Sequence, residues 1–427
     1  MSEKLTHKTA FLLYDLIWGA IIPILRRNQR LAEGFAQRIF QQKPGKADLW
    51  IHAASAGEAY LASGILENLN PSEPTRVLIT SNTKQGIEIL DRAIGDIIPN
   101  TGNITACAAY SPFDKPSVIK KAARDIQPRV MVLLESEIWP GVLRTLKKNK
   151  CRVFIINGRI TDRSLKRYLV WPSLWYSLRP DRILAVSGPD AKRFATLFRT
   201  ENAGVMPNIK FDMVAENRSS EKNPLENILG HDKSLLVIGS VNQEEEPLVE
   251  KIILRIRQNM PGTVTGLFPR HMHRLKHWQE RLDSMEVPWI LRTEIEKTVS
   301  GTMNLHGKII LWDTFGELRM AYELSKAAFV GGSLAPLGGQ NFLEPLTCGI
   351  IPVIGHYWDT FHWVGREIVD QGLVRVADTW REAADILLEN MEQPLSREKV
   401  REASVKYMKD RQGGAAQACR LIEKYLG

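Results

Sequence analysis

The chain has 427 residues, of which 44% are hydrophobic and 25% are charged. This length and composition exclude a disordered or fibrous protein and predict two folded domains. Lysine and arginine outnumber aspartate and glutamate by nine, so we expect a surface that attracts phospholipid, nucleotide or nucleic acid. The four cysteines are far apart and form no C-x-x-C pair, which argues against a zinc site or a disulfide framework and favours a reducing compartment.

An apolar tract covers residues 10–25 and is interrupted by Asp15 and Pro23. Its sixteen residues are fewer than the roughly 20 needed to span a bilayer. A membrane-associating helical segment over residues 1–45 is therefore expected. Three arrangements stay open: the helix lies in the membrane interface, it spans the bilayer, or it packs as the first helix of a soluble domain. The tract is followed by Arg26, Arg27 and Arg30, which would place the main body on the cytoplasmic side.

Short apolar runs alternate with longer amphipathic stretches from residue 48 onward, which predicts parallel strands joined by crossover helices. The first series of predicted strands covers residues 49–54, 75–81, 129–135, 152–158 and 182–188. The second covers residues 234–240, 263–268, 308–313, 327–332 and 350–355. The polar segment 216–223 separates the two series, so we expect domains over 46–215 and 216–427.

Two doubly wound α/β domains would carry their functional loops at the carboxyl ends of the strands. We expect these ends to face one another across a cleft that holds the active site.

Glu58 follows the first strand, in the sequence His-Ala-Ala-Ser-Ala-Gly-Glu that begins at His52. Small residues there leave room for a ligand, and a helix is expected to begin near Gly57. Glu58 is then a candidate general base for an acceptor hydroxyl. An ordinary acidic residue favoured by the helix dipole is the alternative, and the pattern leaves the two equally weighted.

Two further carboxylates, Glu135 and Glu137, stand at the end of the strand predicted over residues 129–135. Acidic residues at a strand end are rarely packing residues. Glu137 comes shortly before Pro140, where a helix could begin, so it is a candidate cap. Glu135 is the better candidate for a functional group.

Cationic side chains follow several strands and are candidates for holding a phosphate or carboxylate. They are Arg159, Lys210 and Arg270. Surface charge is the alternative for each of them. His271 and His273 resemble a metal pair, but no third ligand is near them in the sequence.

A glycine-rich loop over residues 331–345 gives the strongest signal, because it follows a strand and precedes a helix. Glycines allow close backbone approach, and free N–H groups at a helix start can bind an anion, so we expect a phosphate cradle. Glu344 is expected to accept hydrogen bonds from ribose hydroxyls. Residues 312–318 form a similar strand-to-helix turn. The sequence contains no Asp-x-Asp, so we expect no metal cofactor.

Seven motifs occur in one order along nearly the whole chain and together resemble the 3-deoxy-D-manno-octulosonic acid (Kdo) transferases of lipopolysaccharide biosynthesis. They are H-A-A-S-A-G-E (52–58), E-S-E-I-W-P (135–140), N-G-R (157–159), N-I-K-F-D (208–212), P-R-H (269–271), D-T-F-G-E-L (313–318) and G-G-S-L-A-P-L-G-G-Q-N-F-L-E-P (331–345).

This resemblance implies a GT-B fold and an inverting transfer of Kdo from CMP-Kdo to a lipid A precursor at the cytoplasmic face of the bacterial inner membrane. It implies that Glu58 is the base and that Glu135 and Lys210 stabilise the transition state. The implied contacts to CMP are Pro269, Arg270, Phe315, Gly316, Glu317, Asn341, Phe342, Leu343 and Glu344. The last helix is expected to pack back on the first domain, and CMP leaves as a monophosphate, which agrees with the absence of a metal.

Two segments depart from the family pattern. Gln340 stands where the family commonly has histidine, which keeps hydrogen bonding but removes a titrating role. Residues 355–361 differ from the family's G-P-H-x-F-N-F, so we expect the fine specificity for donor or acceptor to differ there. Two alternatives remain: a membrane-associated GT-B enzyme that uses a UDP-sugar, and a non-catalytic protein that binds anionic lipid. A nucleic-acid partner is not expected, because an aromatic-interleaved basic stripe is lacking.

Overall fold

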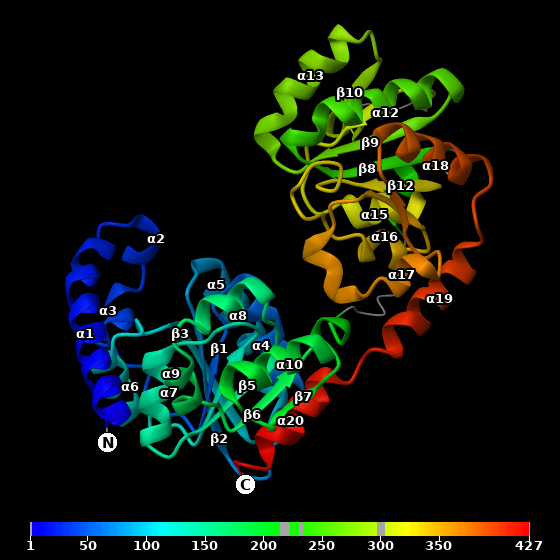
Figure 1. The fold of residues 1–427 in the computed structure, drawn as a ribbon. Coiled ribbons are helices and arrows are strands. Elements are labelled where there is room, and N and C mark those ends of the chain that lie inside the picture. Colours follow the sequence, from blue (N-terminus) through cyan, green and yellow to red (C-terminus); the bar gives the residue numbers. More distant parts are fainter. Residues whose placement is uncertain (1, 214–222, 230–233, 297–303, 427) are drawn as a thin grey trace. The chain divides into compact units, whose positions relative to one another are not determined.

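The computed structural model describes residues 2–213, 223–229, 234–296 and 304–426, and the chain divides into two compact units (Figure 1). Unit 1 consists of Met1–Met213 and Arg411–Gly427, and unit 2 of Val214–Asp410. The domain boundary predicted between residues 215 and 216 lies outside the described residues, as does the segment 216–222.

Within its described residues, unit 1 is built on a seven-stranded parallel sheet with the order β3-β2-β1-β4-β5-β6-β7. The strands are β1 (Leu49–His52), β2 (Thr75–Ser81), β3 (Ile104–Tyr110), β4 (Val130–Leu134), β5 (Arg152–Gly158), β6 (Arg182–Ala185) and β7 (Ala203–Val205). The helices of this unit are α1 (Ser2–Leu25), α2 (Gln29–Ala32), α3 (Phe35–Arg38), α4 (Ala56–Asn68), α5 (Lys84–Ile97), α6 (Pro116–Ile126), α7 (Pro140–Lys148), α8 (Asp162–Tyr168), α9 (Pro172–Ser177), α10 (Gly188–Phe198) and α20 (Gly414–Glu423), with 3-10 turns η1 (Ile98–Asn100) and η2 (Ile209–Phe211).

Both faces of this sheet are buried, as its continuous apolar strands predict. Alternate residues of one strand enter different cores: Trp50 packs in the core that contains α6 and α7, and Ile51 packs in the core that contains α4 and α20. Parallel pairing sets Ile51 opposite Ile79 on β2 and Val132 on β4. All seven strand ends that carry loops to the following helices therefore lie on one edge of the sheet.

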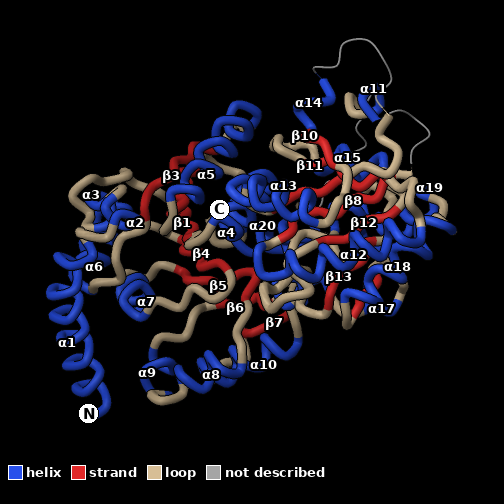
Figure 2. The backbone as a smooth tube through the Cα atoms, turned by 90° about the horizontal axis from the view of Figure 1, so that it is seen from above, coloured by secondary structure: helices blue, strands red, loops and turns tan. Residues whose placement is uncertain are grey.

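Unit 2 repeats this plan, and its described residues form a seven-stranded parallel sheet with the order β10-β11-β9-β8-β12-β13-β14 (Figure 2). The strands are β8 (Leu235–Val241), β9 (Val264–Pro269), β10 (Trp289–Leu291), β11 (Ile309–Leu311), β12 (Ala327–Val330), β13 (Pro352–Gly355) and β14 (Arg375–Ala377). The helices are α11 (Glu226–Leu229), α12 (Glu246–Asn259), α13 (Leu275–Ser284), α14 (Arg292–Glu296), α15 (Leu318–Leu324), α16 (Leu343–Thr347), α17 (Glu367–Asp370), α18 (Trp380–Glu392) and α19 (Arg397–Lys409), with 3-10 turns η3 (Gln243–Glu245), η4 (Met272–Arg274) and η5 (Asp359–Val364).

The predicted architecture of two doubly wound α/β domains is confirmed, and all ten predicted strands are present. Four strands were not predicted: β3, β7, β10 and β14. Each of them lies at an edge of its sheet. An edge strand is covered less completely than a central one, so its sequence is less uniformly apolar. The strand β7, with the sequence Ala-Gly-Val, is partly exposed and gives no apolar run.

The helix α1 packs on unit 1 along one face, beside α6 (Figure 1). Phe11 is buried, the Tyr14 hydroxyl donates to the Asp114 carboxylate at 3.0 Å, and the Asp15 carboxylate accepts from the Ser117 N–H at 2.6 Å. Trp18 stacks on Phe113 with ring centroids 5.6 Å apart. One side of α1 is thus fixed to the domain by both polar and aromatic contacts.

The helix α20 packs on unit 1, although it follows the whole of unit 2 in sequence. Its first N–H groups, those of Gly413 and Ala415, donate to the Asp212 carboxylate at 2.6 and 2.7 Å. Ile422 and Leu426 are buried in the core beneath α4. Asp212, the last residue of the N-I-K-F-D motif, therefore has a structural role as the cap of α20.

Candidate active site

The strand order changes direction between β1 and β4 in unit 1, and between β8 and β12 in unit 2. In open parallel sheets, ligands bind at the carboxyl ends of the strands near such a switch point, because the loops there diverge to opposite sides. Glu58 follows β1 and Glu135 follows β4. The topology therefore places these two predicted residues at the switch point of unit 1.

Glu58 lies in the first turn of α4, which begins at Ala56 as expected from the small residues before it. Its carboxylate accepts from the Ala54 N–H at 2.8 Å and from the Ser55 hydroxyl at 3.1 Å. The Glu58 N–H in turn donates to the Ser55 side chain, which is the N-cap of the helix. These reciprocal bonds fix the carboxylate at the strand end.

The pKa of Glu58 is raised to about 7, first by burial and then by the nearby carboxylates of Glu137 and Glu135, against the hydrogen bonds from Ala54 and Ser55, which lower it. A carboxyl group is best suited to general base catalysis when its pKa lies near the working pH. The helix dipole alone would lower the pKa of an acidic residue in a first turn, so burial and the neighbouring carboxylates dominate here. This environment favours the functional interpretation of Glu58 over the ordinary one.

Glu135 and Lys210, which are 75 positions apart in the sequence, form an ion pair with 2.8 Å between Nζ and Oε1. Glu135 directly follows β4, and Lys210 lies in the turn η2 after β7. Glu135 adopts a φ of +50°, a conformation that costs free energy for a residue with a side chain and that clusters at functional sites. The structure therefore brings together the three predicted catalytic residues, since Glu135 pairs with Lys210 and is close enough to Glu58 to raise the pKa of that carboxyl group.

Two buried asparagines hold the backbone around Lys210. The Asn157 side chain accepts from the Ile209 N–H at 3.0 Å, and Asn157 itself has a φ of +56° at the end of β5. The Asn208 side chain accepts from the Lys210 N–H at 3.0 Å. The asparagines of the N-G-R and N-I-K-F-D motifs thus fix the turn that carries Lys210. The sequence alone indicates only the cations of these two motifs, Arg159 and Lys210, as candidate functional residues.

The interpretation of Glu137 as a helix cap is wrong. Asp114 caps α7 instead, since its carboxylate accepts from the Gly141 and Val142 N–H groups at 2.9 and 2.7 Å. Glu137 turns toward β1, accepts from the Trp139 indole at 2.6 Å and lies 3.5 Å from Nε2 of His52. Because Glu137 also raises the pKa of Glu58, it belongs to the group of carboxylates around the candidate site, although the sequence favoured Glu135 over it.

The predicted nucleotide contacts of unit 2 follow β9, β11 and β12, which lie on the same sheet. Pro269 ends β9 and is buried, and Arg270 next to it is exposed. Adjacent strands are about 4.8 Å apart, so the loops after β11 and β12 begin about 14 Å from one another along the sheet edge. This places the predicted contacts along one edge.

Phe315 and Glu317 have opposite environments in the turn after β11. The Phe315 side chain is 81% exposed, which is unusual for a large aromatic residue and suits a ligand contact. Glu317 pairs through both oxygens with the buried Arg292 at 2.9 and 3.0 Å, and accepts from the Trp312 indole at 2.7 Å. Glu317 thus shapes the turn that presents Phe315, with Gly316 at a φ of +86° between them.

The glycine-rich loop after β12 does not offer all its N–H groups to a ligand, which corrects the expected phosphate cradle. The buried Glu245 carboxylate accepts from the N–H groups of Gly332, Ser333 and Leu334, at distances of 2.5, 3.3 and 3.4 Å. A fourth bond comes from the Asn242 N–H at 2.9 Å. Glu245 therefore occupies the anion position at the start of the loop, so any ligand must be held further along it.

The second half of this loop contains the remaining predicted contacts. Asn341 is exposed and accepts from the Leu343 N–H at 3.2 Å, and Phe342 and Leu343 are buried. Burial raises the pKa of Glu344, while Arg319 lowers it. Of the four predicted contacts from Asn341 to Glu344, only Asn341 and Glu344 have polar side chains that are not fully buried, so these two could contact a ligand. Within the described part of the chain, no cluster of three His, Cys, Asp or Glu side chains is arranged to hold a metal ion.

Comparison with known proteins agrees with these motifs. Residues 28–213 match the family described as 3-deoxy-D-manno-octulosonic-acid transferase (kdotransferase). The chain is 28% identical over 412 residues to a 3-deoxy-D-manno-octulosonic acid transferase of Haemophilus influenzae, covering 94% of this chain and 92% of that protein. It is 26% identical over 398 residues to a transferase of the same name from Bordetella pertussis, covering 90% and 89%.

The fold is similar to that of a glycosyltransferase from Rickettsia africae, with a TM-score of 0.57 at 10% sequence identity. The match covers 89% of this chain and 99% of that one. At this identity the likeness concerns the fold alone. Together with the two parallel seven-stranded sheets, it confirms the expected GT-B fold class.

Replacing Glu245 by alanine is predicted to loosen the glycine-rich loop, because the N–H groups of residues 332–334 lose their acceptor. Loss of buried hydrogen-bond partners costs about 1–3 kcal/mol, so these amides should exchange hydrogen about tenfold faster or more. Hydrogen exchange measured by mass spectrometry on peptides covering residues 331–345 tests this. The exposed neighbour Glu244, replaced by alanine, is the control, and equal protection in both variants would contradict the role of Glu245.

Proposed function

We propose that the chain is a glycosyltransferase of the Kdo transferase family, and that it transfers Kdo from CMP-Kdo to a lipid A precursor with inversion at the anomeric carbon. Glu58 is the observation that carries the proposal. It is a buried carboxyl group at the switch point of unit 1, with a pKa of about 7 and a fixed orientation. A UDP-sugar donor would be the competing choice within the same fold.

In the proposed reaction, an acceptor hydroxyl oxygen attacks the anomeric carbon of Kdo. The bond from that carbon to the phosphate oxygen of CMP breaks, and CMP leaves with the bonding electrons. The hydroxyl proton passes to the Glu58 carboxylate. A single displacement inverts the configuration and needs only one base, so no second carboxylate has to form a covalent intermediate.

Lys210 is proposed to stabilise negative charge on the reacting groups. Its ammonium group is held by Glu135 and keeps part of its surface accessible, with 24% of the side chain exposed. Two asparagine side chains fix its backbone, so little reorganisation accompanies the reaction. Glu135 is then a positioning residue, which orients the lysine through their ion pair.

Unit 2 is proposed to bind the nucleotide. Its exposed aromatic residue, Phe315, suits contact with a base, and the exposed Arg270 suits contact with the phosphate. Asn341 and Glu344 supply polar groups for the ribose. These assignments use the residues that the family resemblance implies, with Glu317 acting through Arg292 and Trp312 on the shape of its turn.

Replacing Glu58 by glutamine is predicted to reduce turnover about 10²- to 10⁴-fold, because an amide keeps the shape but cannot accept the proton. CMP binding, measured by calorimetry, should persist. The control is Glu67→Gln, an exposed residue of the same helix. In the unmodified protein, kcat/KM should fall about tenfold per pH unit below about 7, since Glu58 becomes protonated there. Retained turnover in Glu58→Gln would refute its role as the base.

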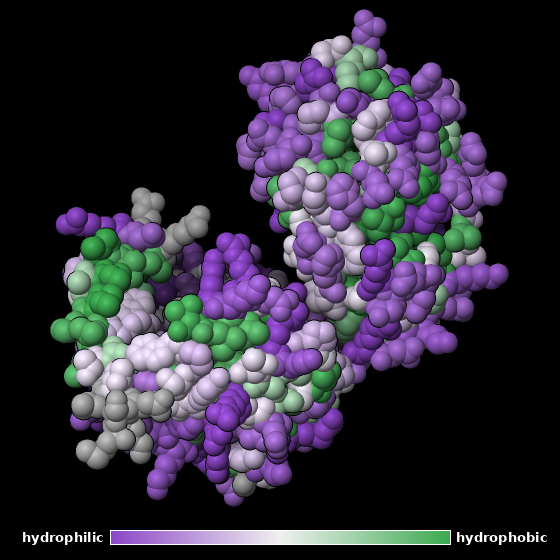
Figure 3. All heavy atoms as spheres, viewed as in Figure 1, coloured by the Kyte–Doolittle hydropathy of each residue, from purple (hydrophilic) through white to green (hydrophobic). Residues whose placement is uncertain are grey.

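We further propose that α1 lies in the membrane interface rather than spanning it. This helix is long and apolar enough to cross a bilayer. One face, however, is fixed to unit 1 through Tyr14, Asp15 and Trp18. The opposite face is an exposed apolar stripe, seen in green in Figure 3, which contains Leu12, Leu13, Leu16, Ile17, Ile21 and Ile24. A helix with one apolar face and one docked face suits monotopic binding.

Replacing Leu16 and Ile17 by glutamate is predicted to release the protein from phospholipid vesicles, because both side chains are more than half exposed and make up the middle of the stripe. Burying a charge in hydrocarbon costs several kcal/mol, and the fold should be unaffected. Vesicle flotation measures the bound fraction. Leu254→Glu, at an exposed apolar residue of unit 2, is the control. Unchanged flotation of the double variant would contradict the assignment of this face.

A further inference from the structure

A pocket of about 1010 Å³ lies in unit 1 at the amino-terminal ends of β4 and β5. Its lining includes the residues that directly precede these strands, and β5 itself begins at Arg152. Glu58 and Glu135 lie at the opposite end of the same sheet. Since β4 has five residues, the two edges are separated by about 17 Å. The pocket is therefore separate from the candidate active site.

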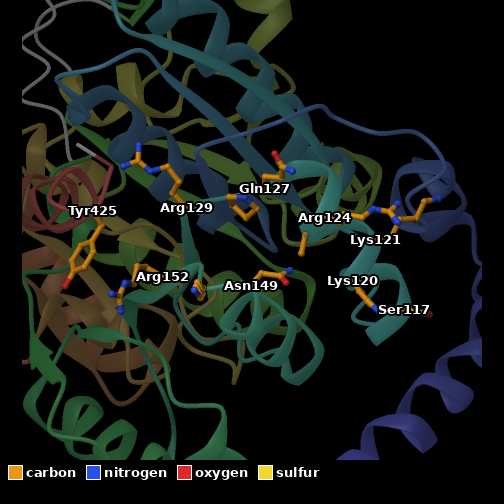
Figure 4. Close-up of a pocket in the computed structure, with 12 residues that line it drawn as sticks. Ser117, Lys120, Lys121, Arg124, Gln127, Arg129, Asn149, Arg152 and Tyr425 are labelled. Carbon is orange, nitrogen blue, oxygen red and sulfur yellow. The ribbon is translucent and has the colours of Figure 1, made fainter.

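The chemistry of the lining is strongly cationic. Six of its twelve residues are lysine or arginine, and none is aspartate or glutamate: Lys120, Lys121, Arg124, Arg129, Lys150 and Arg152. Three of them come from α6, Arg129 directly precedes β4, Lys150 lies in the turn before β5, and Arg152 begins β5. Figure 4 shows Arg129 and Arg152 near Tyr425, Lys121 and Arg124 on the other side, and Gln127 and Asn149 between them.

Part of this charge has a structural explanation. Arg124 lies in the last turn of α6, where a cation complements the helix dipole, and it pairs with Asp125 at 2.9 Å. Arg152 pairs with Asp181 at 2.8 Å. The other four cations form no ion pair with the residues that the structure describes: Lys120, Lys121, Arg129 and Lys150. Arg129 still interacts with Asp48, whose pKa its charge helps to lower, so Lys120, Lys121 and Lys150 are the pocket cations with no acidic partner among the described residues.

The positive potential extends toward α1. Burial lowers the pKa of Lys148, and so do the neighbouring cations Arg144, Lys8 and Lys120. Lys8 belongs to α1, and Lys120 belongs to both this group and the pocket lining. Cations are thus gathered closely enough to disfavour one another, an arrangement that a bound anion would relieve.

We propose that this pocket binds a ligand that carries two or more phosphate groups. Lysine and arginine are the side chains that recognise phosphate, and arginine does so through paired hydrogen bonds. The volume is at the upper end of small-molecule sites, which exceeds the needs of a single small ion. The ligand can come from two sources, a phosphorylated lipid headgroup at the membrane beside α1, or a soluble polyphosphate.

Calorimetry with sodium tripolyphosphate on the full chain tests the shared chemistry. The variant Lys120→Glu with Lys150→Glu changes two exposed lysines of the pocket, and Lys166→Glu with Lys192→Glu makes the same charge change on α8 and α10. We expect the pocket variant to bind at least about tenfold more weakly, a difference of about 1.4 kcal/mol. The control should bind as the unmodified protein does. Equal affinities in both variants, or no binding by the unmodified protein, would overturn the proposal.

Flotation with phosphatidylcholine vesicles, with and without cardiolipin, distinguishes the sources, because the cardiolipin headgroup carries two phosphates. Cardiolipin-dependent binding that the pocket variant alone loses identifies a lipid headgroup as the source. Weaker tripolyphosphate binding with unchanged flotation identifies a soluble ligand, and either result supports a phosphate site. Neither measurement depends on sugar transfer, so a failure here is distinguishable from a failure of the proposed function.

Discussion

The bonds between the Glu58 carboxyl group and the turn from Ala54 to Ser55 are the interaction on which the account of this site depends. They close the first turn of α4 and hold the side chain at the end of β1. The same residue that begins a helix is thereby a fixed, buried carboxyl group whose pKa is about 7. Two nearby carboxylates, Glu135 and Glu137, contribute to that value, and Lys210 pairs with Glu135. The hydrogen bonds that close the first turn of α4 are therefore the same bonds that hold the carboxyl group of the candidate base in place.

The central strands of both sheets could be predicted from the sequence, because burial on both faces demands continuous apolar runs. The edge strands β3, β7, β10 and β14 could not, since partial exposure removes that demand. Parallel strands also made the edge that carries functional residues predictable, because their carboxyl ends coincide. Glu58 and Glu135 could therefore be chosen as candidates from their distance to a strand end, whereas the catalytic roles proposed for them come from the family resemblance.

Roles that depend on partners distant in sequence were harder to predict. The Glu245 carboxylate accepts hydrogen bonds from N–H groups of a loop some 87 positions away in the sequence. Arg292 pairs with Glu317, which is 25 positions away. In the sequence, Glu245 is one of three consecutive glutamates after a strand, and nothing distinguishes it from its exposed neighbour Glu244. The capping of α7 by Asp114, where Glu137 was expected, has the same explanation, because the segment before α6 meets the start of α7 only in the folded protein.

Mass spectrometry of the acceptor lipid, after incubation of the protein with CMP-Kdo and a lipid A precursor, tests the central claim most directly. The account predicts that the lipid gains the mass of one or more Kdo residues, and that a UDP-sugar offered in place of CMP-Kdo leaves its mass unchanged. A lipid that gains mass only with the UDP-sugar would contradict the account, and so would a lipid that gains none with CMP-Kdo.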